Sequence, residues 1–256
     1  MSLKQAIQRE FGVARSVYQR YRGAHGAWRD ALLRPLVRPG DLVFDIGAHV
    51  GDCIASLRRL DARVVAVEPQ PALARALWVL HGRDRRVMLE CVAVGAAVAD
   101  AADAEMSLNL ANPSVSTLSR AFVTAAQGRQ AWRAQRWEGK LRVPMTTLDR
   151  LIARHGEPRF CKIDVEGYEV AVLQGLSRPL AALSFEFTTI QRQVARQALE
   201  ACERLGRYRY NAALGASASL VHAHWLSAEA IGCWIEGLPE AANSGDIYAI
   251  RVDVPS

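Results

Sequence analysis

The chain has 256 residues, of which 50% are hydrophobic and 23% are charged, so it can bury a full core. Its five cysteines lie far apart, include no CxxC pair and are odd in number, which argues against a disulfide framework or a zinc site. The N-terminus is polar, and no uncharged apolar run reaches the length of about 18 residues that a membrane span needs. We therefore expect a soluble, cytoplasmic protein with one main domain.

The formal net charge is +6, and most of the basic residues are arginine. A basic surface can bind nucleic acid or an anionic membrane, but no Lys/Arg block here is long enough to form a dedicated stripe. In residues 129–142, Trp132 and Trp137 alternate with arginines. These tryptophans could stack on bases, or they could face the core or close over a pocket. The sequence identifies no firm nucleic-acid or membrane partner.

Helical and strand patterns alternate along the chain. Residues 1–36 carry apolar positions at helical spacing, with Gly23 and Gly26 as a break. The patterns that follow predict strands and helices in turn, at 42–46, 51–60, 63–69, 71–81 and 86–95. Residues 96–140 predict an irregular insertion, and KLRVPMTTLDRLIARHG predicts a strand and a helix capped by Thr or Asp. This alternation is typical of parallel βαβ units in one doubly wound α/β sheet.

The stretch GDLVFDIGAHVGD, residues 40–52, passes from the pattern of a fully buried strand into a glycine turn. The apolar run stops at Asp45, and Gly47 and Gly51 frame a tight connection to the next helix. A backbone without Cβ atoms can approach a ligand closely and can adopt positive φ. The turn is therefore a candidate wall of a nucleotide site, although glycine also ends strands for purely structural reasons.

Acidic residues follow several of the predicted strands. Glu68 comes after the second strand, Asp164 follows the strand in FCKIDVEG, and Glu186 lies in AALSFEF. In open α/β sheets, ligands bind outside the carboxyl ends of the strands. We therefore expect Asp45, Glu68, Asp164 and Glu186 to converge on one crevice.

Glu68 lies 23 residues after Asp45, where a carboxylate can accept hydrogen bonds from the ribose hydroxyls of NAD or S-adenosylmethionine. A pyrophosphate needs the close approach of a G-x-G-x-x-G turn, but the turn here is Gly-Ala-His-Val-Gly and lacks the middle glycine. The absent glycine and the several acids favour the sulfonium cofactor with its cationic groups. A nicotinamide-dependent reductase remains the alternative enzyme, and a basic nucleic-acid-binding module with a degenerate pocket is the alternative outside enzymes.

A set of motifs resembles the FkbM-type S-adenosylmethionine-dependent methyltransferases in order and approximate spacing: VFDIGAHVGD, AVEPQP, VPMTTLD, KIDVEGYEVAVLQGL, LSFEF and GDIYAI. The resemblance covers about residues 37–250. It implies a seven-stranded class I methyltransferase sheet whose last strand is antiparallel, and methyl transfer to a hydroxyl of a sugar, a small molecule or a natural-product-like acceptor. It divides the chain into an N-terminal helical extension, 1–36, and a methyltransferase domain, 37–256, with the insertion 96–140 on the substrate side.

The resemblance also implies roles for residues of the cofactor site. Asp45, Gly47 and Gly51 would hold the methionine end of S-adenosylmethionine, and Glu68 would hold the ribose hydroxyls. Farther along, Pro69 would shape the wall, and Val92 and Ala93, taken as the end of the third strand, would flank adenine. His49 stands where many members of the family carry asparagine, so a hydrogen-bond donor is retained there.

Three residues are candidates for catalysis. Asp164 could act as base or as a partner of the cofactor ammonium, followed by Glu166 and His49, because an alcohol must lose its proton when it is methylated. Each acid also has a structural interpretation: Asp164 could cap the helix near EGYEV, and Glu166 could complement the dipole of that helix.

Further candidates concern the acceptor and a metal. Ser114 and Ser116, in the loop NPSVST, and Glu186 could contact the acceptor, although the loop could equally be a plain turn. Together, Asp164, Glu166 and Glu186 could hold Mg²⁺, but their spacing does not establish this. His222 and His224 lack an evident third ligand, so we assign no metal. The acceptor is expected to be a small molecule, and a homo-oligomer is compatible with the sequence.

Overall fold

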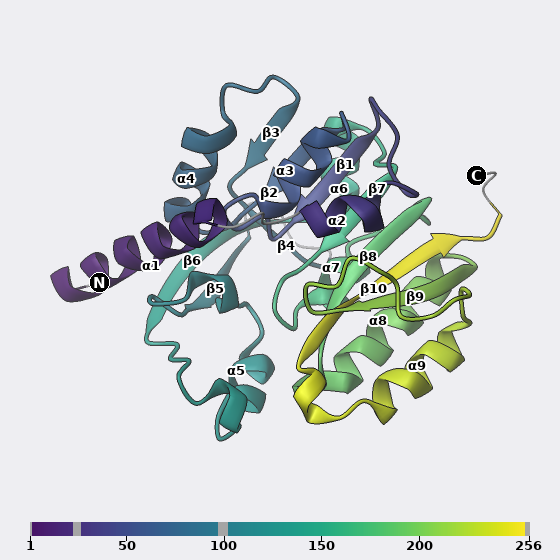
Figure 1. Ribbon diagram of the computed structural model, residues 1–256. Coiled ribbons are helices and arrows are strands. Elements are labelled where there is room, and N and C mark those ends of the chain that lie inside the picture. The colour runs from purple at the N-terminus through teal and green to yellow at the C-terminus, as the bar shows by residue number, and fades with distance from the viewer. Residues whose placement is uncertain (1, 23–26, 97–101, 254–256) are drawn as a thin grey trace.

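The computed structural model describes residues 2–22, 27–96 and 102–253. Its centre is a seven-stranded sheet with helices on both faces (Figure 1). In spatial order the strands are β3 (Val87–Glu90), β2 (Arg63–Val67), β1 (Leu42–Ile46), β7 (Phe160–Ile163), β8 (Ala182–Thr188), β10 (Ser244–Arg251) and β9 (Tyr208–Leu214). Pairs from β3 to β8 are parallel, whereas β10 is antiparallel to β8 and β9. The mostly parallel, doubly wound fold with an antiparallel last strand is therefore confirmed.

Two hydrophobic layers cover the sheet, because successive side chains of each buried strand point to opposite faces. One layer packs against the amphipathic helices α6 (Leu148–His155), α7 (Glu169–Gln174), α8 (Arg192–Leu205) and α9 (Ala228–Gly237). The other packs against α2 (Ala27–Leu33), α3 (Asp52–Arg59) and α4 (Pro71–His81). This burial on both faces leaves the carboxyl ends of the parallel strands as the edge where polar side chains gather.

The strand predicted over 86–95 is in fact divided. β3 ends at Glu90, opposite Val67, the last residue of β2, so the chain has no further partner in the main sheet. It turns and forms β4 (Ala93–Val94), which pairs with β6 (Gly139–Thr146) in a separate three-stranded sheet.

The expectation of an irregular insertion at 96–140 is also wrong for part of that range. It contains β5 (Asp103–Leu108), which pairs antiparallel with β6, and the helix α5 (Arg120–Ala126). Met106 and Leu108 alternate into a small core of their own, shared with Val143. Two short 3₁₀ turns, η1 (Pro113–Val115) and η2 (Gln130–Trp132), complete the segment.

Three elements near the C-terminus have no counterpart in our sequence analysis. The helices α8 and α9 and the strand β9 flank β10, and together they close one side of the sheet. Without β9 the sheet has six strands, so the seventh strand implied by the family resemblance is found here. The 3₁₀ turns η3 (Thr189–Gln191) and η4 (Glu240–Ala242) adjoin α8 and β10.

The N-terminal helix α1 (Leu3–Arg22) lies across the body of the molecule and extends beyond it (Figure 1). Gly12 approaches the carbonyl oxygen of Leu110 so closely that an added Cβ would lie 2.2 Å from it. The guanidinium of Arg20 donates to the Val50 carbonyl at 2.8 Å. The break predicted at Gly23 and Gly26 lies outside the described residues. No helix within the described part of the chain combines the length and apolarity needed to cross a membrane.

Candidate active site

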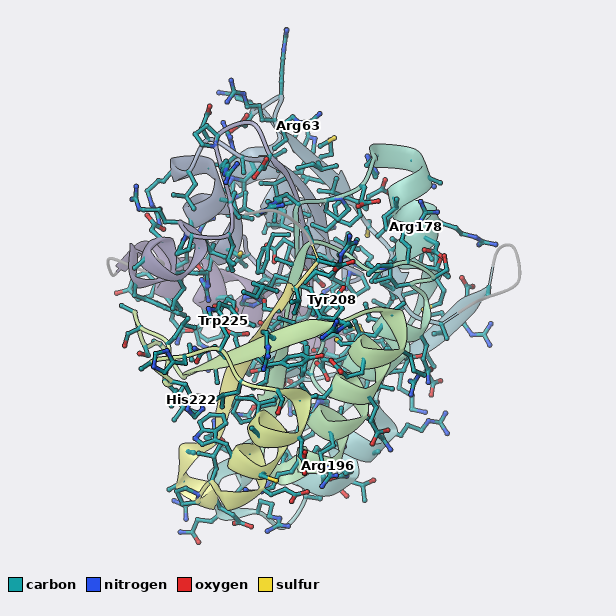
Figure 2. All side chains as sticks on the ribbon, turned by 90° about the vertical axis from the view of Figure 1, so that its right-hand side faces the viewer. Arg63, Arg178, Arg196, Tyr208, His222 and Trp225 are labelled. Carbon is teal, nitrogen blue, oxygen red and sulfur yellow. The ribbon has the colours of Figure 1, made fainter. Side chains whose placement is uncertain are left out.

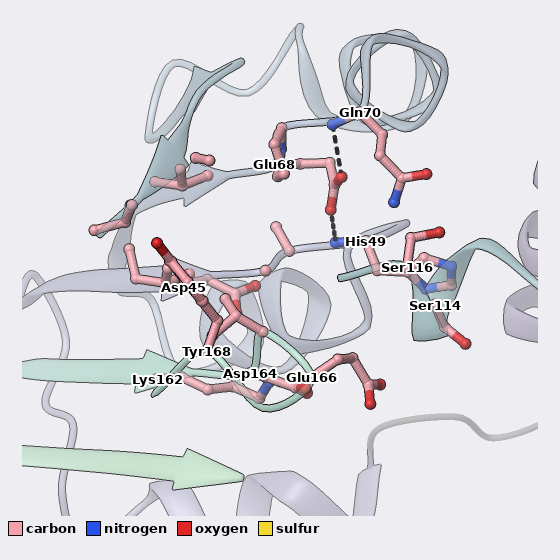
Figure 3. A pocket seen from close by; sticks show the side chains of 18 of the residues that line it. Asp45, His49, Glu68, Gln70, Ser114, Ser116, Lys162, Asp164, Glu166 and Tyr168 are labelled. Carbon is pink, nitrogen blue, oxygen red and sulfur yellow. Dashed lines mark hydrogen bonds and ion pairs between the residues drawn. The ribbon is translucent and has the colours of Figure 1, made fainter. Parts of the chain in front are cut away.

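The turn between β1 and α3 forms one wall of a pocket at the carboxyl ends of the strands (Figure 3). Gly47 has φ 85°, and a Cβ at this position would lie 1.8 Å from the carbonyl oxygen of Asp164. The glycine is therefore required by the close approach of two backbone segments, β1 and β7. His49 is left-handed as well, with φ 50°.

Gly51 is placed differently from the other predicted residues of this turn. It is not among the described residues that line the pocket. It precedes α3 with φ 85°, and an added Cβ would lie 2.6 Å from Nε2 of His81 on α4. Tight packing between α3 and α4 therefore explains why this residue is a glycine.

Asp45 lines the pocket and is fully buried. Neither of its carboxylate oxygens has a hydrogen-bond partner among the described residues. Burial raises the pKa of Asp45, while the charges of Lys162 and Arg29 oppose that rise. A buried carboxylate without a partner is costly, so this group is suited to receive a donor from a ligand.

Glu68 is held between two backbone amides (Figure 3). His49 N donates to one carboxylate oxygen at 3.0 Å, and Gln70 N donates to the other at 2.9 Å. Each oxygen has a second lone pair that a ligand hydroxyl can use. Burial raises the pKa of Glu68 to about 7, although both backbone hydrogen bonds lower it.

Three carboxyl groups, which we call the acid trio, meet on the opposite side of the pocket. One oxygen from each of Asp164, Glu166 and Glu186 lies within 4.8 Å of the others. Among the described residues, these three side chains form the group that could bind a metal ion. Lys162 Nζ donates to Asp164 Oδ2 at 2.6 Å, whereas Oε2 of Glu186 is buried and has no hydrogen-bond partner among the described residues. Three like charges at such distances cannot all be ionised.

The charges of the acid trio are divided by their surroundings. Burial raises the pKa of Asp164, but the ammonium of Lys162 outweighs that effect and leaves this pKa below its usual value. Burial and the neighbouring acids raise the pKa values of Glu166 and Glu186 well above their usual value. The surroundings therefore favour the ionised form of Asp164 and the protonated forms of Glu166 and Glu186.

The interpretation of Asp164 as a helix cap is not what the structure shows at the start of α7. The helix begins at Glu169, whose own side chain accepts hydrogen bonds from Val165 N and Gly167 N at 3.2 and 3.1 Å. Asp164 makes no such capping hydrogen bond within the described residues, and both Asp164 and Glu166 line the pocket.

The predicted wall residues Pro69, Val92 and Ala93 also line the pocket. Val92 lies in the connection into β4 and Ala93 is the first residue of β4, so neither ends the third strand as expected, because β3 stops at Glu90. Gln70 continues this wall and donates through its side chain to the Pro113 carbonyl at 3.2 Å.

The loop around Ser114 and Ser116 forms the rim. Both serines line the pocket. The Ser116 hydroxyl accepts from Asn109 N at 3.1 Å, and the Ser114 hydroxyl donates to Asn112 Oδ1 at 3.0 Å. Each hydroxyl thus also stabilises the loop, as the plain-turn interpretation requires.

The ring of His49 contacts the N-terminal helix. Nε2 lies 3.1 Å from the Ser16 hydroxyl on α1, and burial lowers the pKa of His49. The neutral ring therefore joins α1 to the pocket wall, while the His49 backbone amide serves Glu68.

Three residues that line the pocket were not among the predicted site residues: Lys162, Arg29 and Tyr168. Lys162 could have been found, since a lysine inside the buried strand FCKI requires an ionic partner. Arg29 comes from α2, far from any motif, so only the tertiary structure brings it to the pocket.

The tryptophans of 129–142 pack inward. Phe122 makes edge-on contacts with Trp132 and Trp137, at ring distances of 5.2 and 6.1 Å, and Trp137 Nε1 donates to the Val115 carbonyl. These contacts support the core-facing interpretation over base stacking.

Among the described residues, neither the arginines labelled in Figure 2 nor His222 forms a second site. Arg63, Arg178 and Arg196 lie far apart on the side of the molecule shown in Figure 2. His222 packs edge-on against Trp234 at 5.1 Å, and no metal-binding group within the described residues contains it.

No curated protein matches the chain. Among solved structures it is similar to an O-methyltransferase from Bacillus cereus in complex with SAH, with 14% identity, a TM-score of 0.48, and 95% of this chain and 90% of that chain covered. It is also similar to a TehB-like SAM-dependent methyltransferase from Corynebacterium glutamicum, with 12% identity, a TM-score of 0.46 and 93% of each chain covered. At these scores the fold assignment rests on the strand order itself.

A family model gives the stronger result. The model described as the methyltransferase FkbM domain matches residues 45–212, from the acid near the end of β1 to the middle of β9. The match includes Glu68 and the whole acid trio, and it favours a methyltransferase over a nicotinamide-dependent reductase. The chain belongs to the FkbM family of S-adenosylmethionine-dependent methyltransferases.

Proposed function

We propose that the protein methylates a hydroxyl oxygen of a small molecule, a sugar or a natural-product-like acceptor. The observation that carries the proposal is the arrangement of the pocket, in which a clamped ribose-type carboxylate, Glu68, faces the same space as the acid trio. The first group suits a nucleoside and the second suits removal of a hydroxyl proton.

The residues present fit S-adenosylmethionine. Asp45 offers an unpartnered carboxylate to an ammonium, and Glu68 offers free lone pairs to two ribose hydroxyls. Pro69, Val92 and Ala93 supply an apolar wall for a flat base. When bound, this cofactor supplies an electrophilic methyl group on a sulfonium.

The protein contributes position and a proton acceptor. Holding the acceptor oxygen in line at attack distance supplies much of the acceleration of such a displacement. The ionised Asp164 carboxylate, fixed by Lys162, accepts a hydrogen bond from the acceptor hydroxyl and orients its oxygen. The hydroxyl proton then passes to Asp164, because this acid of the trio favours its ionised form.

Isothermal titration calorimetry with S-adenosylmethionine and S-adenosylhomocysteine tests cofactor binding. We expect micromolar affinity that Glu68→Ala abolishes, because the ribose loses both acceptors. Glu157→Ala, a change at an exposed acid that does not line the pocket, is the matched control and keeps the affinity. A folded protein that binds neither compound contradicts the proposal, and binding of NADH in their place supports the reductase.

Release of S-adenosylhomocysteine in the presence of candidate acceptors tests the reaction. We expect release with compounds that carry a free hydroxyl and none with the same compounds after that hydroxyl has been methylated. Methyl transfer to amines or carbons alone contradicts the O-methyltransferase assignment.

A further inference from the structure

We infer that Arg29 and Asp45 form a subsite for an amino-acid zwitterion, in which Arg29 binds the α-carboxylate of the cofactor and Asp45 binds its ammonium. This inference rests on the proposed function and extends it to a residue outside the matched family domain, since Arg29 precedes residue 45.

Arg29 brings an unpartnered cation to the pocket. It lines the pocket from α2, its guanidinium Nε is buried, and that atom has no hydrogen-bond partner among the described residues. Its guanidinium carbon lies 4.5 Å from the ring centre of Trp28, a contact that leaves the N–H donors unused. A buried guanidinium with unused donors has a large unmet demand for an acceptor.

The position of Arg29 is fixed by its neighbours in α2. Asp30 accepts two hydrogen bonds from Arg59 of α3, both at 2.7 Å. Leu32 and Leu33 are buried in the layer that α2 shares with α3. Because both sides of α2 are held in this way, the Arg29 side chain is presented to the pocket on a rigid support.

The groups that face Arg29 are acids and neutral side chains, and none of them accepts a hydrogen bond from its guanidinium Nε. The nearest electrostatic neighbours are Cys53, Asp246, Tyr248 and Asp45. Burial raises the pKa of the Cys53 thiol and the Tyr248 hydroxyl, so both stay neutral. Within the described residues Arg29 forms no ion pair with either acid, so the opposite charges share one space without contact.

The other buried cation of the pocket is already occupied. Lys162 donates to Asp164 at 2.6 Å. Of the lysines and arginines that line the described pocket, Arg29 is therefore the one available to a carboxylate. Asp45, with two unpartnered oxygens, is the matching acid for an ammonium.

An α-amino acid carries these two opposite charges on one carbon. Asp45 is the penultimate residue of β1, and Cys53 lies in the first turn of α3, so the subsite lies at the β1–α3 turn. Glu68, the ribose acceptor, is reached from the same turn through the His49 amide. The cofactor has its zwitterion at one end and its ribose beyond it, which matches this order.

The test compares S-adenosylmethionine with its decarboxylated form, which lacks only the carboxylate, and with 5′-methylthioadenosine, which lacks the whole amino-acid group. Calorimetry measures all three with the wild type, with Arg29→Met and with Arg34→Met, an exposed control on the following turn. We expect Arg29→Met to weaken S-adenosylmethionine by roughly 10- to 100-fold, the size of a charged hydrogen bond, and to leave the other two ligands within about twofold. Arg34→Met leaves all three affinities unchanged.

Asp45→Asn tests the other half of the subsite. We expect it to weaken S-adenosylmethionine and the decarboxylated form alike, because both keep the ammonium, and to spare 5′-methylthioadenosine.

Two results overturn the inference. If Arg29→Met weakens the affinity for all three ligands equally, Arg29 only supports the fold. If the affinity for S-adenosylmethionine is unchanged, Arg29 does not bind the cofactor and is available to an anionic acceptor instead. Failure of the wild type to bind any of the three contradicts the proposed function, which is a distinct result.

Discussion

At the scale of single residues, chemistry in this pocket is set by burial more than by residue type. Glu68 and Asp164 are carboxylic acids that directly follow β2 and β7, and Glu186 is a carboxylic acid within β8. Lys162 keeps the pKa of Asp164 low, whereas burial raises those of the other two. Burial and neighbouring charge therefore decide whether the same functional group favours its ionised or its protonated form at each position.

The clearest residue-level prediction concerns Asp164→Asn. An amide cannot take the proton of the acceptor hydroxyl, so turnover should fall by roughly 10²- to 10⁴-fold. Affinity for S-adenosylhomocysteine should be kept, because Glu68 and Asp45 still hold that ligand. Single-turnover methylation and calorimetry measure the two quantities, and a variant that retains both refutes the role of Asp164.

Glu68 predicts a pH dependence of cofactor affinity. Its pKa is about 7 in the free protein, and the ribose hydroxyls bind its ionised form. Below pH 7 the group must first lose a proton, so affinity should fall by up to about tenfold for each pH unit. Calorimetry from pH 5.5 to 8.5 should show this slope in the wild type and a flatter profile in Glu68→Gln; the same slope in both would exclude Glu68 as its source.

At the scale of elements, the β1–α3 turn joins the two halves of the site because it packs directly against the end of β7. Gly47 is the contact point, and Gly51 performs the equivalent function against α4. The glycine spacing that indicates a ligand site in the sequence is thus explained first by contacts within the protein.

Gly47→Ala tests this explanation. Both Gly47 and Gly40 have φ near 85°, but a Cβ at Gly40 meets nothing within 4 Å. Gly40→Ala should therefore cost only the backbone strain, about 1–2 kcal/mol in the free energy of unfolding. Gly47→Ala adds a clash with the Asp164 carbonyl and should cost clearly more. Urea denaturation compares them, and equal losses would show that the turn relaxes without cost.

At the scale of the whole molecule, the fold gathers buried acids at one edge of the sheet, and their raised pKa values connect stability with pH. Glu68 and Glu169 each titrate at about 7 in the folded state, against 4.5 for an ordinary glutamate. A group with a raised pKa stabilises the folded state below its unfolded value, and that contribution is lost as pH rises through the folded value. Burial lowers the pKa of His81 to about 4. The stability that this group contributes is therefore lost as pH falls, but only below about pH 6.5.

We therefore expect the melting temperature of the ligand-free protein to fall between pH 6.5 and 8. Glu169→Gln keeps an acceptor for the Val165 and Gly167 amides and removes one titrating group. The melting temperature of this variant should therefore fall less over the same pH range. Differential scanning calorimetry at several pH values measures both. A melting temperature that is constant over this range contradicts the assignment of the raised pKa values.

Much of the site could be predicted because it follows local patterns. Apolar runs that end in acid identify Asp45, Glu68 and Asp164, and the fold then brings all of them to one pocket. The division of 86–95 between two sheets could not be predicted, since it depends on where β2 ends and on the partner that β6 offers. For the same reason Tyr208–Leu214, which pairs with β10 at the sheet edge, has no counterpart in the sequence analysis.

The sequence by itself determined the alternation of strands and helices, the position of the cofactor turn and the family, because each depends on neighbouring residues and fixed spacing. Only the tertiary structure decided that α2 places Arg29 in the pocket, that Lys162 neutralises Asp164, and that Trp132 and Trp137 pack inward on Phe122. These outcomes depend on contacts between elements remote in the chain, and on burial, which sets the charge of each acid and cannot be calculated before the elements are assembled.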